Sequence, residues 1–172
     1  PHGIDIEIIS ADAADMSGMK KILGRIGSGG HPVRGIFHLA GVDIKTGIPE
    51  MTIEEIRSAA GAKIKGAWIL HELTKDLDLD HFVLFSSIAS VTGSEKMAHY
   101  AGANAFLDAL SHLRRQMGLP SVCINWGPWK GGGMAADEDI RQYDRIGNHA
   151  LDPSGALEIL DHLIGNGQVQ TL

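Results

Sequence analysis

The sequence contains a single cysteine, Cys123, among its 172 residues. One thiol permits no disulfide within the chain, which agrees with a reducing compartment, and we expect a cytoplasmic protein. No apolar run approaches the length of a membrane span, and no stretch has the pattern of a signal peptide. These absences exclude a disulfide-stapled fold and a membrane-spanning apolar helix.

Positive charge is also scarce, because 15 Lys and Arg stand against 21 Asp and Glu, for a net charge of −6. Binding to nucleic acid needs clustered basic residues, and Arg114 and Arg115 are the only adjacent arginines. We expect these two to lie near a helix C-terminus, where cations suit the helix dipole. We therefore expect no binding to nucleic acid. The nine histidines show no ligand spacing with Cys or carboxylates, so we expect no metal site either.

What remains is an ordinary globular composition, with 44% hydrophobic and 21% charged residues. The length suits one domain over residues 1–172. Residues 1–3 do not resemble a natural start, and residues 169–172 read as the beginning of a strand. We therefore expect this chain to be a piece of a larger polypeptide.

Apolar strands and amphipathic helices alternate along the chain. We expect strands at 4–9, 33–39, 82–85 and 121–125, and helices at 16–26, from 52 onward, at 96–117, 137–146 and 154–164. Such alternation predicts an α/β fold with a doubly wound parallel sheet and helices on both faces. No internal repeat interrupts this order.

Ligands of such sheets bind beyond the carboxyl ends of the strands. In this chain those ends are followed by Asp12, Ala40-Gly41, Ser86-Ser87 and Gly127-Pro128-Trp129. We expect these residues to line one crevice.

The helix that begins after Thr52 carries a lysine in an unusual place. Its apolar stripe is formed by Ile56, Ala60, Ala67 and Leu70. Lys63 lies in the middle of this stripe, whereas Lys65 points the opposite way into solvent. Two interpretations of Lys63 stay open: its stem lies along the apolar surface with the ammonium in water, or a polar group inside receives the charge.

Two further polar residues, Tyr100 and Asn104, stand one helical turn apart and project together, on the helix that follows Ser86 and Ser87. A phenol titrates near pH ~10, and a nearby cation makes its proton easier to give. A serine hydroxyl can hold a substrate oxygen beside it. This set suits proton delivery to a carbonyl oxygen, with hydride supplied to carbon by a cofactor.

Several motifs in order resemble the ketoreductase domain of modular type I polyketide synthases, in the short-chain dehydrogenase/reductase superfamily. They are Phe37-His38-Leu39-Ala40-Gly41-Val42, Lys63-Ile64-Lys65-Gly66-Ala67-Trp68, Leu70-His71-Glu72-Leu73-Thr74, Phe82-Val83-Leu84-Phe85-Ser86-Ser87, the run Tyr100 to Leu110, and Ile124-Asn125-Trp126-Gly127-Pro128-Trp129. The resemblance covers nearly the whole chain and implies a Rossmann-like fold.

The resemblance also implies roles for individual residues. Tyr100 would be the proton donor, and Ser87, thirteen residues before it, would orient the carbonyl. Lys63 and Asn104 would complete the catalytic set, in the exchanged positions typical of these ketoreductases. The substrate would be a β-ketoacyl chain on an acyl carrier protein, reduced to the β-hydroxy form with NADPH, with neighbouring synthase domains in the same polypeptide.

Cofactor-binding residues follow from the same resemblance. Asp12 would lie near the adenine, Ala40 and Gly41 beside the adenosine ribose, and the segment Gly127, Pro128 and Trp129 at the nicotinamide end. Ser86 is also assigned to the cofactor side. The region of about 130–150, including Met134, resembles a mobile lid over the substrate.

The sequence departs from the family in three places. The chain lacks three features of the family: the Gly-rich dinucleotide fingerprint, the second strand and the basic residue that selects NADPH. It therefore corresponds to the C-terminal two thirds of the catalytic subdomain. Without that pyrophosphate cradle we expect the isolated chain to bind NADPH weakly or not at all. The motifs that report stereochemistry are absent at 43–45 and at Thr92, so the product configuration stays open.

Two alternatives to a ketoreductase remain. One is a structural domain that has lost activity, and the other is a superfamily member acting on a small carbonyl or a sugar nucleotide. The presence of Lys63, Ser87, Tyr100 and Asn104 argues against the first, and Asn104 with the segment 126–129 argues against the second.

Overall fold

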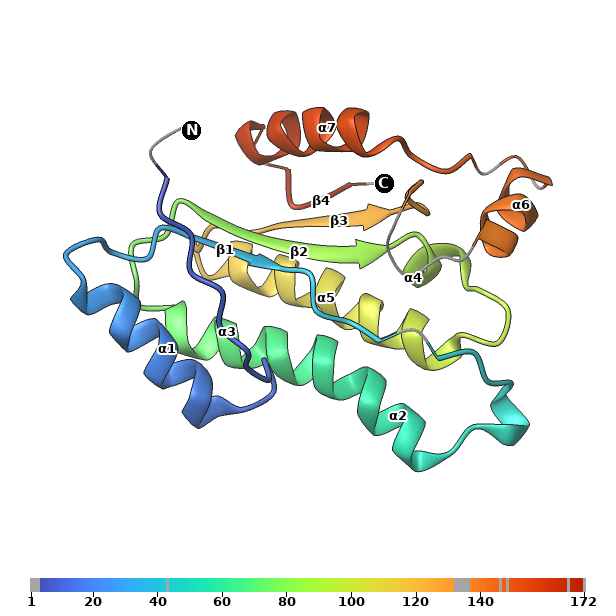
Figure 1. The fold of residues 1–172 in the computed structure, drawn as a ribbon, viewed down its shortest axis with the longest axis horizontal. Coiled ribbons are helices and arrows are strands. Elements are labelled where there is room, and N and C mark those ends of the chain that lie inside the picture. The colour runs from blue at the N-terminus through green and yellow to red at the C-terminus, as the bar shows by residue number, and fades with distance from the viewer. Residues whose placement is uncertain are drawn as a thin grey trace.

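A four-stranded parallel sheet lies at the centre of the molecule (Figure 1), in a computed structural model that describes residues 4–42, 44–131, 137–145, 147, 149–166 and 168–171. The strands, in the order β1-β2-β3-β4, are β1 Gly35–His38, β2 His81–Ser87, β3 Val122–Trp126 and β4 Gln170–Thr171. Each neighbouring pair is parallel. The predicted parallel α/β architecture is confirmed.

Helices cover both faces of this sheet (Figure 1). Those on one face are α1 Met16–Ser28, α2 Ile53–Ala60, a π-helical segment Gly61–Lys65, α3 Gly66–Thr74 and α5 Ala98–Gln116. The opposite face carries α7 Pro153–Gly165. The shorter elements are a 3-10 turn at Ile48–Glu50, α4 Ala89–Thr92 and α6 Asp137–Arg145.

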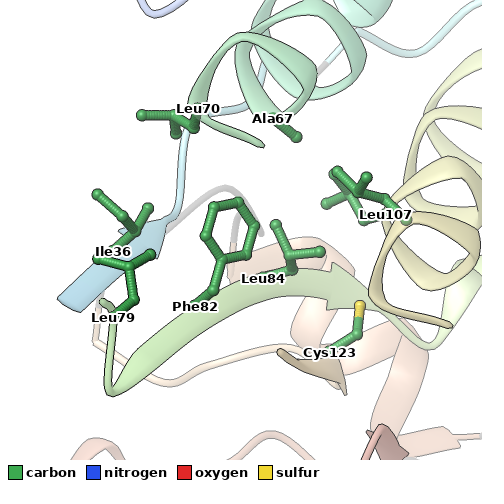
Figure 2. Packing of buried hydrophobic residues seen from close by; sticks show 9 residues of the cluster. Ile36, Ala67, Leu70, Leu79, Phe82, Leu84, Leu107 and Cys123 are labelled. Atoms are coloured by element: carbon green, nitrogen blue, oxygen red, sulfur yellow. The ribbon is translucent and has the colours of Figure 1, made fainter. Parts of the chain in front are cut away.

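Alternation along β2 divides the core into two clusters. Phe82 and Leu84 face one way and pack with Ile36, Leu70 and Leu107 (Figure 2). Val83, which lies between them in the strand, faces the other way. It belongs to a second cluster with Ile124, Trp126 and Ala156 of α7. This alternation follows from the two-residue period of a strand and buries β2 from both sides.

The long helix begins with the expected capping box. Thr52 accepts the N–H of Glu55 at 3.2 Å, and the Glu55 carboxylate accepts the N–H of Thr52 at 2.8 Å. The helix is not α-helical throughout, because the π segment Gly61–Lys65 separates α2 from α3. That irregularity was not predicted, since nothing in the hydrophobic pattern interrupts the helical period there.

One expected strand is wrong. Residues 4–9 form no strand, and Ile4, Ile6 and Ile8 are 73, 84 and 94% exposed. A strand needs a neighbour to satisfy its backbone, and among the described residues β1 pairs with β2 and with no other strand. The alternating apolar pattern is present, but the described part of the chain offers it no partner. A short helix, α4, lies between β2 and α5, in a segment that the sequence predicts only as a Gly-containing loop.

The sequence predicts that the core-facing stripe of α5 consists of Ala103, Phe106, Leu110, Leu113 and Met117, and the structure buries only part of it. Leu113 and Met117 are 38 and 51% exposed, while Leu107 and Arg114 are fully buried. The Arg114 guanidinium lies 3.7 Å from the centre of the Phe82 ring and donates to the carbonyl of Pro120. Arg114 does lie in the last turn of the helix, but stacking and hydrogen bonding hold its side chain inside. None of the described helices is long and apolar enough to cross a membrane.

Candidate active site

The carboxyl ends of the strands meet at one edge of the sheet, as parallel topology requires. Leu39 follows the end of β1, Ser87 ends β2, and Trp126 ends β3 in direct register with Ser87. Helix α5 packs against β2, and the hydroxyl of Ser86 donates to the carbonyl of Asn104. Lys63 of the long helix contacts Phe85 of β2 and lies beside Tyr100 of α5, and Ser87 ends the same strand.

Lys63 turns its side chain into the molecule. It is 4% exposed, and its Nζ donates a hydrogen bond of 2.9 Å to the carbonyl oxygen of Phe85. The same Nζ lies 5.5 Å from the centre of the Tyr100 ring. Lys65 is exposed, as expected. Of the two interpretations of Lys63, the structure selects the one in which polar groups inside receive the charge.

Burial lowers the pKa of Lys63 to about 8. The charges of Cys123 and Asp108 act in the opposite direction. Burial also raises the pKa of the Cys123 thiol far above neutrality, so the carboxylate of Asp108 is the anion that supports the ammonium at neutral pH. Lys63 is therefore cationic at neutral pH and close to releasing its proton.

Tyr100 and Asn104 lie in the first two turns of α5. The Asn104 side chain is fully buried, and its Nδ2 donates to the carbonyl of Tyr100 at 2.9 Å. Its Oδ1 is buried without a hydrogen-bond partner. A buried amide oxygen of this kind is suited to accept a hydrogen bond from a ligand or a water molecule.

The two serines at the end of β2 differ in their surroundings. Ser86 is buried, donates to the carbonyl of Asn104 at 3.3 Å and accepts from Asn125 at 3.2 Å. Ser87 is half-buried and accepts the N–H of Ala89 at 3.2 Å. The hydroxyl of Ser86 ties β2 to its neighbours, whereas that of Ser87 lies nearer to solvent.

A carboxylate that we did not predict joins these elements. Asp108 accepts hydrogen bonds from Ser90 Oγ at 2.6 Å, from Asn125 Nδ2 at 3.0 Å and from the Cys123 thiol at 3.2 Å. It thereby links α5 to α4 and β3. Its spacing of four from Asn104 places it on the same helix face, a signal that could have identified it.

A cavity of about 270 Å³ opens beyond β3. Its lining includes Ile88, Asn125, Trp126, Gly127, Pro128 and His149. The indole Nε1 of Trp126 is buried without a hydrogen-bond partner. Trp129 packs edge-on against Trp126, with ring centres 5.1 Å apart, and Leu151 donates to the carbonyl of Pro128 at 2.8 Å. The segment 127–129 is thus fixed beside the cavity.

The remaining predicted cofactor residues follow β1 or precede α1. Ala40 and Gly41 are half-buried directly after β1. Asp12 is exposed and accepts the N–H of Ala14 at 2.8 Å. Of the expected lid, α6 is described, while Met134 lies outside the described residues.

The family model named KR domain matches residues 1–131. The chain is 39% identical over 166 residues to the phenolphthiocerol synthesis polyketide synthase type I Pks15/1 of Mycobacterium marinum, covering 94% of this chain and 8% of that synthase. It is 37% identical over 164 residues to the mycoketide-CoA synthase of Mycobacterium tuberculosis, covering 92% of this chain and 4% of that protein.

Solved ketoreductases are similar in structure. One, described as an A-type ketoreductase from a modular polyketide synthase, matches with a TM-score of 0.93 and 39% identity over 98% of this chain and 36% of its own. The ketoreductase from the first module of phoslactomycin biosynthesis in Streptomyces matches with a TM-score of 0.89 and 37% identity, over 94% of this chain and 38% of its own. The chain therefore belongs to the KR domain family of polyketide synthase ketoreductases, and it spans little more than a third of those solved chains.

Proposed function

We propose that this chain carries the proton-donating half of a ketoreductase. Its substrate would be a β-ketoacyl chain on an acyl carrier protein, which is reduced to the β-hydroxy form with NADPH. Because the chain spans 36–38% of the solved ketoreductases it matches, we propose that it works within a longer synthase polypeptide.

The observation that carries the proposal is the position of the Lys63 ammonium, 5.5 Å from the Tyr100 ring in a buried setting. An ammonium beside a phenol stabilises the phenolate, so the phenol gives up its proton more readily. Tyr100 would then protonate the substrate carbonyl oxygen while Ser87 holds that oxygen in place. This pairing of acid and cation suits carbonyl reduction.

Asn104 has a supporting part in the proposed reaction. Its unpartnered Oδ1 lies on the same face of α5 as Tyr100. A water molecule bound there would connect the site with solvent and return the proton that Tyr100 gives up.

The residues present fit the nicotinamide end of a dinucleotide. Gly127 and Pro128 line the cavity into which ligands of this sheet would enter, and the Trp126 indole N–H there lacks a partner. When bound, the cofactor supplies the hydride. Trp129 would pack behind this end, with Asp12, Ala40, Gly41 and Ser86 toward the rest of the cofactor and the region of about 130–150 acting as a lid.

Replacing Tyr100 tests the proposal. In the full polypeptide that carries this chain, we expect Y100F to lower the reduction of a β-ketoacyl thioester by about a hundredfold or more, because Tyr100 is the proposed donor and phenylalanine has no hydroxyl proton to give. The measurement is cofactor oxidation followed by absorbance, with circular dichroism to show that the variant is folded.

The same assay separates the alternative functions. Unchanged reduction by Y100F would remove the proposed mechanism. A wild-type polypeptide that reduces no carbonyl would indicate a structural domain, and preference for a sugar nucleotide over the thioester in a substrate panel would indicate a different reductase.

A further inference from the structure

His38 is a buried histidine that the reaction described above does not use. It ends β1, is 2% exposed, and pairs in register with Leu84 of β2. Its Nε2 lies 3.2 Å from the backbone carbonyl oxygen of Lys63. Because a carbonyl only accepts, the imidazole proton is on Nε2 and His38 is the donor.

The carbonyl that His38 contacts belongs to the π segment Gly61–Lys65. At its end the N–H of Gly66 bonds to the carbonyl of Gly61, five residues back instead of four as in an α-helix, and also to the carbonyl of Lys63. A π segment inserts one residue into a helical turn, which rotates the side chains on one side of it relative to those on the other by about 100°. The direction of Lys63 therefore depends on whether this segment keeps its shape.

Close packing brings the π segment and β1 together. A Cβ on Gly66 would lie 3.2 Å from both Ala13 Cβ and His38 Cε1. Glycine at this position lets the helix approach the strand closely enough for the imidazole to reach the Lys63 carbonyl.

Lys63 is consequently held at both ends. His38 holds its backbone carbonyl, and the carbonyl of Phe85 receives its ammonium. Loss of the first contact leaves a buried carbonyl with one partner fewer and lets the π segment relax toward regular helix. The ammonium would then lose its place beside Tyr100.

We propose that His38 is a positioning residue, which directs Lys63 toward Tyr100 by anchoring the backbone of the π segment. The inference rests on the proposed function for its catalytic consequence, but the structural claim stands apart from it. Burial lowers the pKa of His38 to about 4, so the ring stays neutral at the pH where the enzyme would work. The charge of Lys63 is supported by Asp108, not by His38.

Two amide substitutions in the full polypeptide isolate the contact. In H38Q the side-chain amide nitrogen occupies the place of the imidazole Nε2 and can still donate to the Lys63 carbonyl. In H38N the side chain is one bond shorter, and its amide nitrogen does not reach that carbonyl. H71N is the matched control, because His71 is also 2% exposed but bonds to Arg114.

We expect H38N to lower kcat by about tenfold to a hundredfold with little change in the KM for a β-ketoacyl thioester. The alkaline limb of its pH–rate profile should move to higher pH, because Tyr100 loses the nearby ammonium. H38Q should restore both properties, and H71N should leave the profile in place even where it lowers stability.

Hydrogen exchange followed by mass spectrometry tests the anchoring without reference to activity. Peptides covering 61–66 should exchange faster in H38N than in wild type, and at nearly the wild-type rate in H38Q. Equal exchange in H38N and wild type, or equal kcat and pH limbs in H38N and H38Q, would overturn the inference. If the wild-type polypeptide reduces no β-ketoacyl thioester, the proposed function is wrong, but the exchange experiment still tests the anchoring by His38. Should H38N fail to fold, H38L makes the same comparison with H38Q.

Discussion

The ammonium of Lys63 is nearly shut off from water, and burial lowers its pKa to about 8. The structure tolerates this because the Phe85 carbonyl accepts its hydrogen bond and the Asp108 charge lies nearby. Holding a charge in such a place lowers stability, and active sites commonly accept this cost.

The unfolding free energy should carry the signature of that buried lysine. The folded pKa of about 8 lies below the ordinary 10.5, so between these values the unfolded chain holds more protons than the folded chain. Stability therefore rises with pH across this window, by about 3 kcal/mol at most from one lysine at 1.36 kcal/mol per pKa unit. The raised pKa of the buried Cys123 thiol acts in the opposite direction above its ordinary value of 9.0, so the rise is measured as the difference between wild type and K63M in denaturant unfolding at a series of pH values.

The variant K63M should lack this rise and be at least as stable as wild type at neutral pH. K65M serves as the control, because Lys65 is exposed, and should keep the wild-type slope. If the unfolding free energy of K63M changes with pH in the same way as that of wild type, Lys63 is not buried as a charge.

Some residues of the site could be predicted from sequence and others could not. Lys63 was identifiable because a charge stood in the middle of an apolar stripe. The burial of Arg114 could not be predicted in this way, because a cation near a helix C-terminus is already accounted for by the helix dipole. Its stacking on Phe82 depends on a tertiary contact. His38 alternates with buried Ile36 in β1, a pattern that indicates burial but not a partner in another element.

At the scale of elements, α5 organises the site. It carries Tyr100 and Asn104 toward Lys63, and one turn later Asp108 binds Ser90 of α4 and Asn125 of β3. A buried network of this kind stabilises its elements only when each member keeps its partners. Asp108 should therefore fix the relative positions of α5 and the strand ends.

Replacing this carboxylate should loosen the site. In D108N a donor amide group replaces an oxygen that now accepts, so we expect a loss of about 2 kcal/mol in unfolding free energy. The pKa of Lys63 should fall further, because the supporting anion is gone. Reduction in the full polypeptide should slow severalfold.

The control is D161N, which changes an exposed aspartate on α7. It should alter neither stability nor rate. If D108N and D161N behave alike, the network has no part in holding the site.

Element boundaries followed from local signals where these were sufficient. The capping box fixed the start of α2, and residues 16–26 were recognised as α1. The expected strand at 4–9 failed because strand formation depends on a neighbour that no local pattern supplies. The predicted stripe of α5 is wrong only toward its end for a related reason: Ala103 and Leu110 are buried, but tertiary packing leaves Leu113 and Met117 exposed.

For the whole molecule, alternation of strands and helices was enough to predict the fold class. The meeting of the strand ends then followed from parallel topology, whereas the strand order β1-β2-β3-β4 was not predicted and comes from the structure. The molecule contains the proposed carbonyl side of a ketoreductase site, and the fingerprint that would cradle a pyrophosphate is not among its sequence motifs.

The 172-residue chain alone should therefore bind NADPH weakly. Titration followed by cofactor fluorescence should show no tight complex, while the full polypeptide that carries the chain should bind it. Submicromolar binding by the chain alone would contradict this expectation and would mean that residues near Asp12, Ala40 and Gly41 suffice to hold the cofactor.

Lys63 beside Tyr100 is the feature on which the proposed reaction depends most. The most direct measurement compares K63M with K65M in the full polypeptide, by the rate of β-ketoacyl thioester reduction under saturating cofactor. We expect K63M to lose about a hundredfold or more in rate, while K65M keeps the wild-type rate. Equal rates in the two variants would contradict the proposed role of the buried lysine.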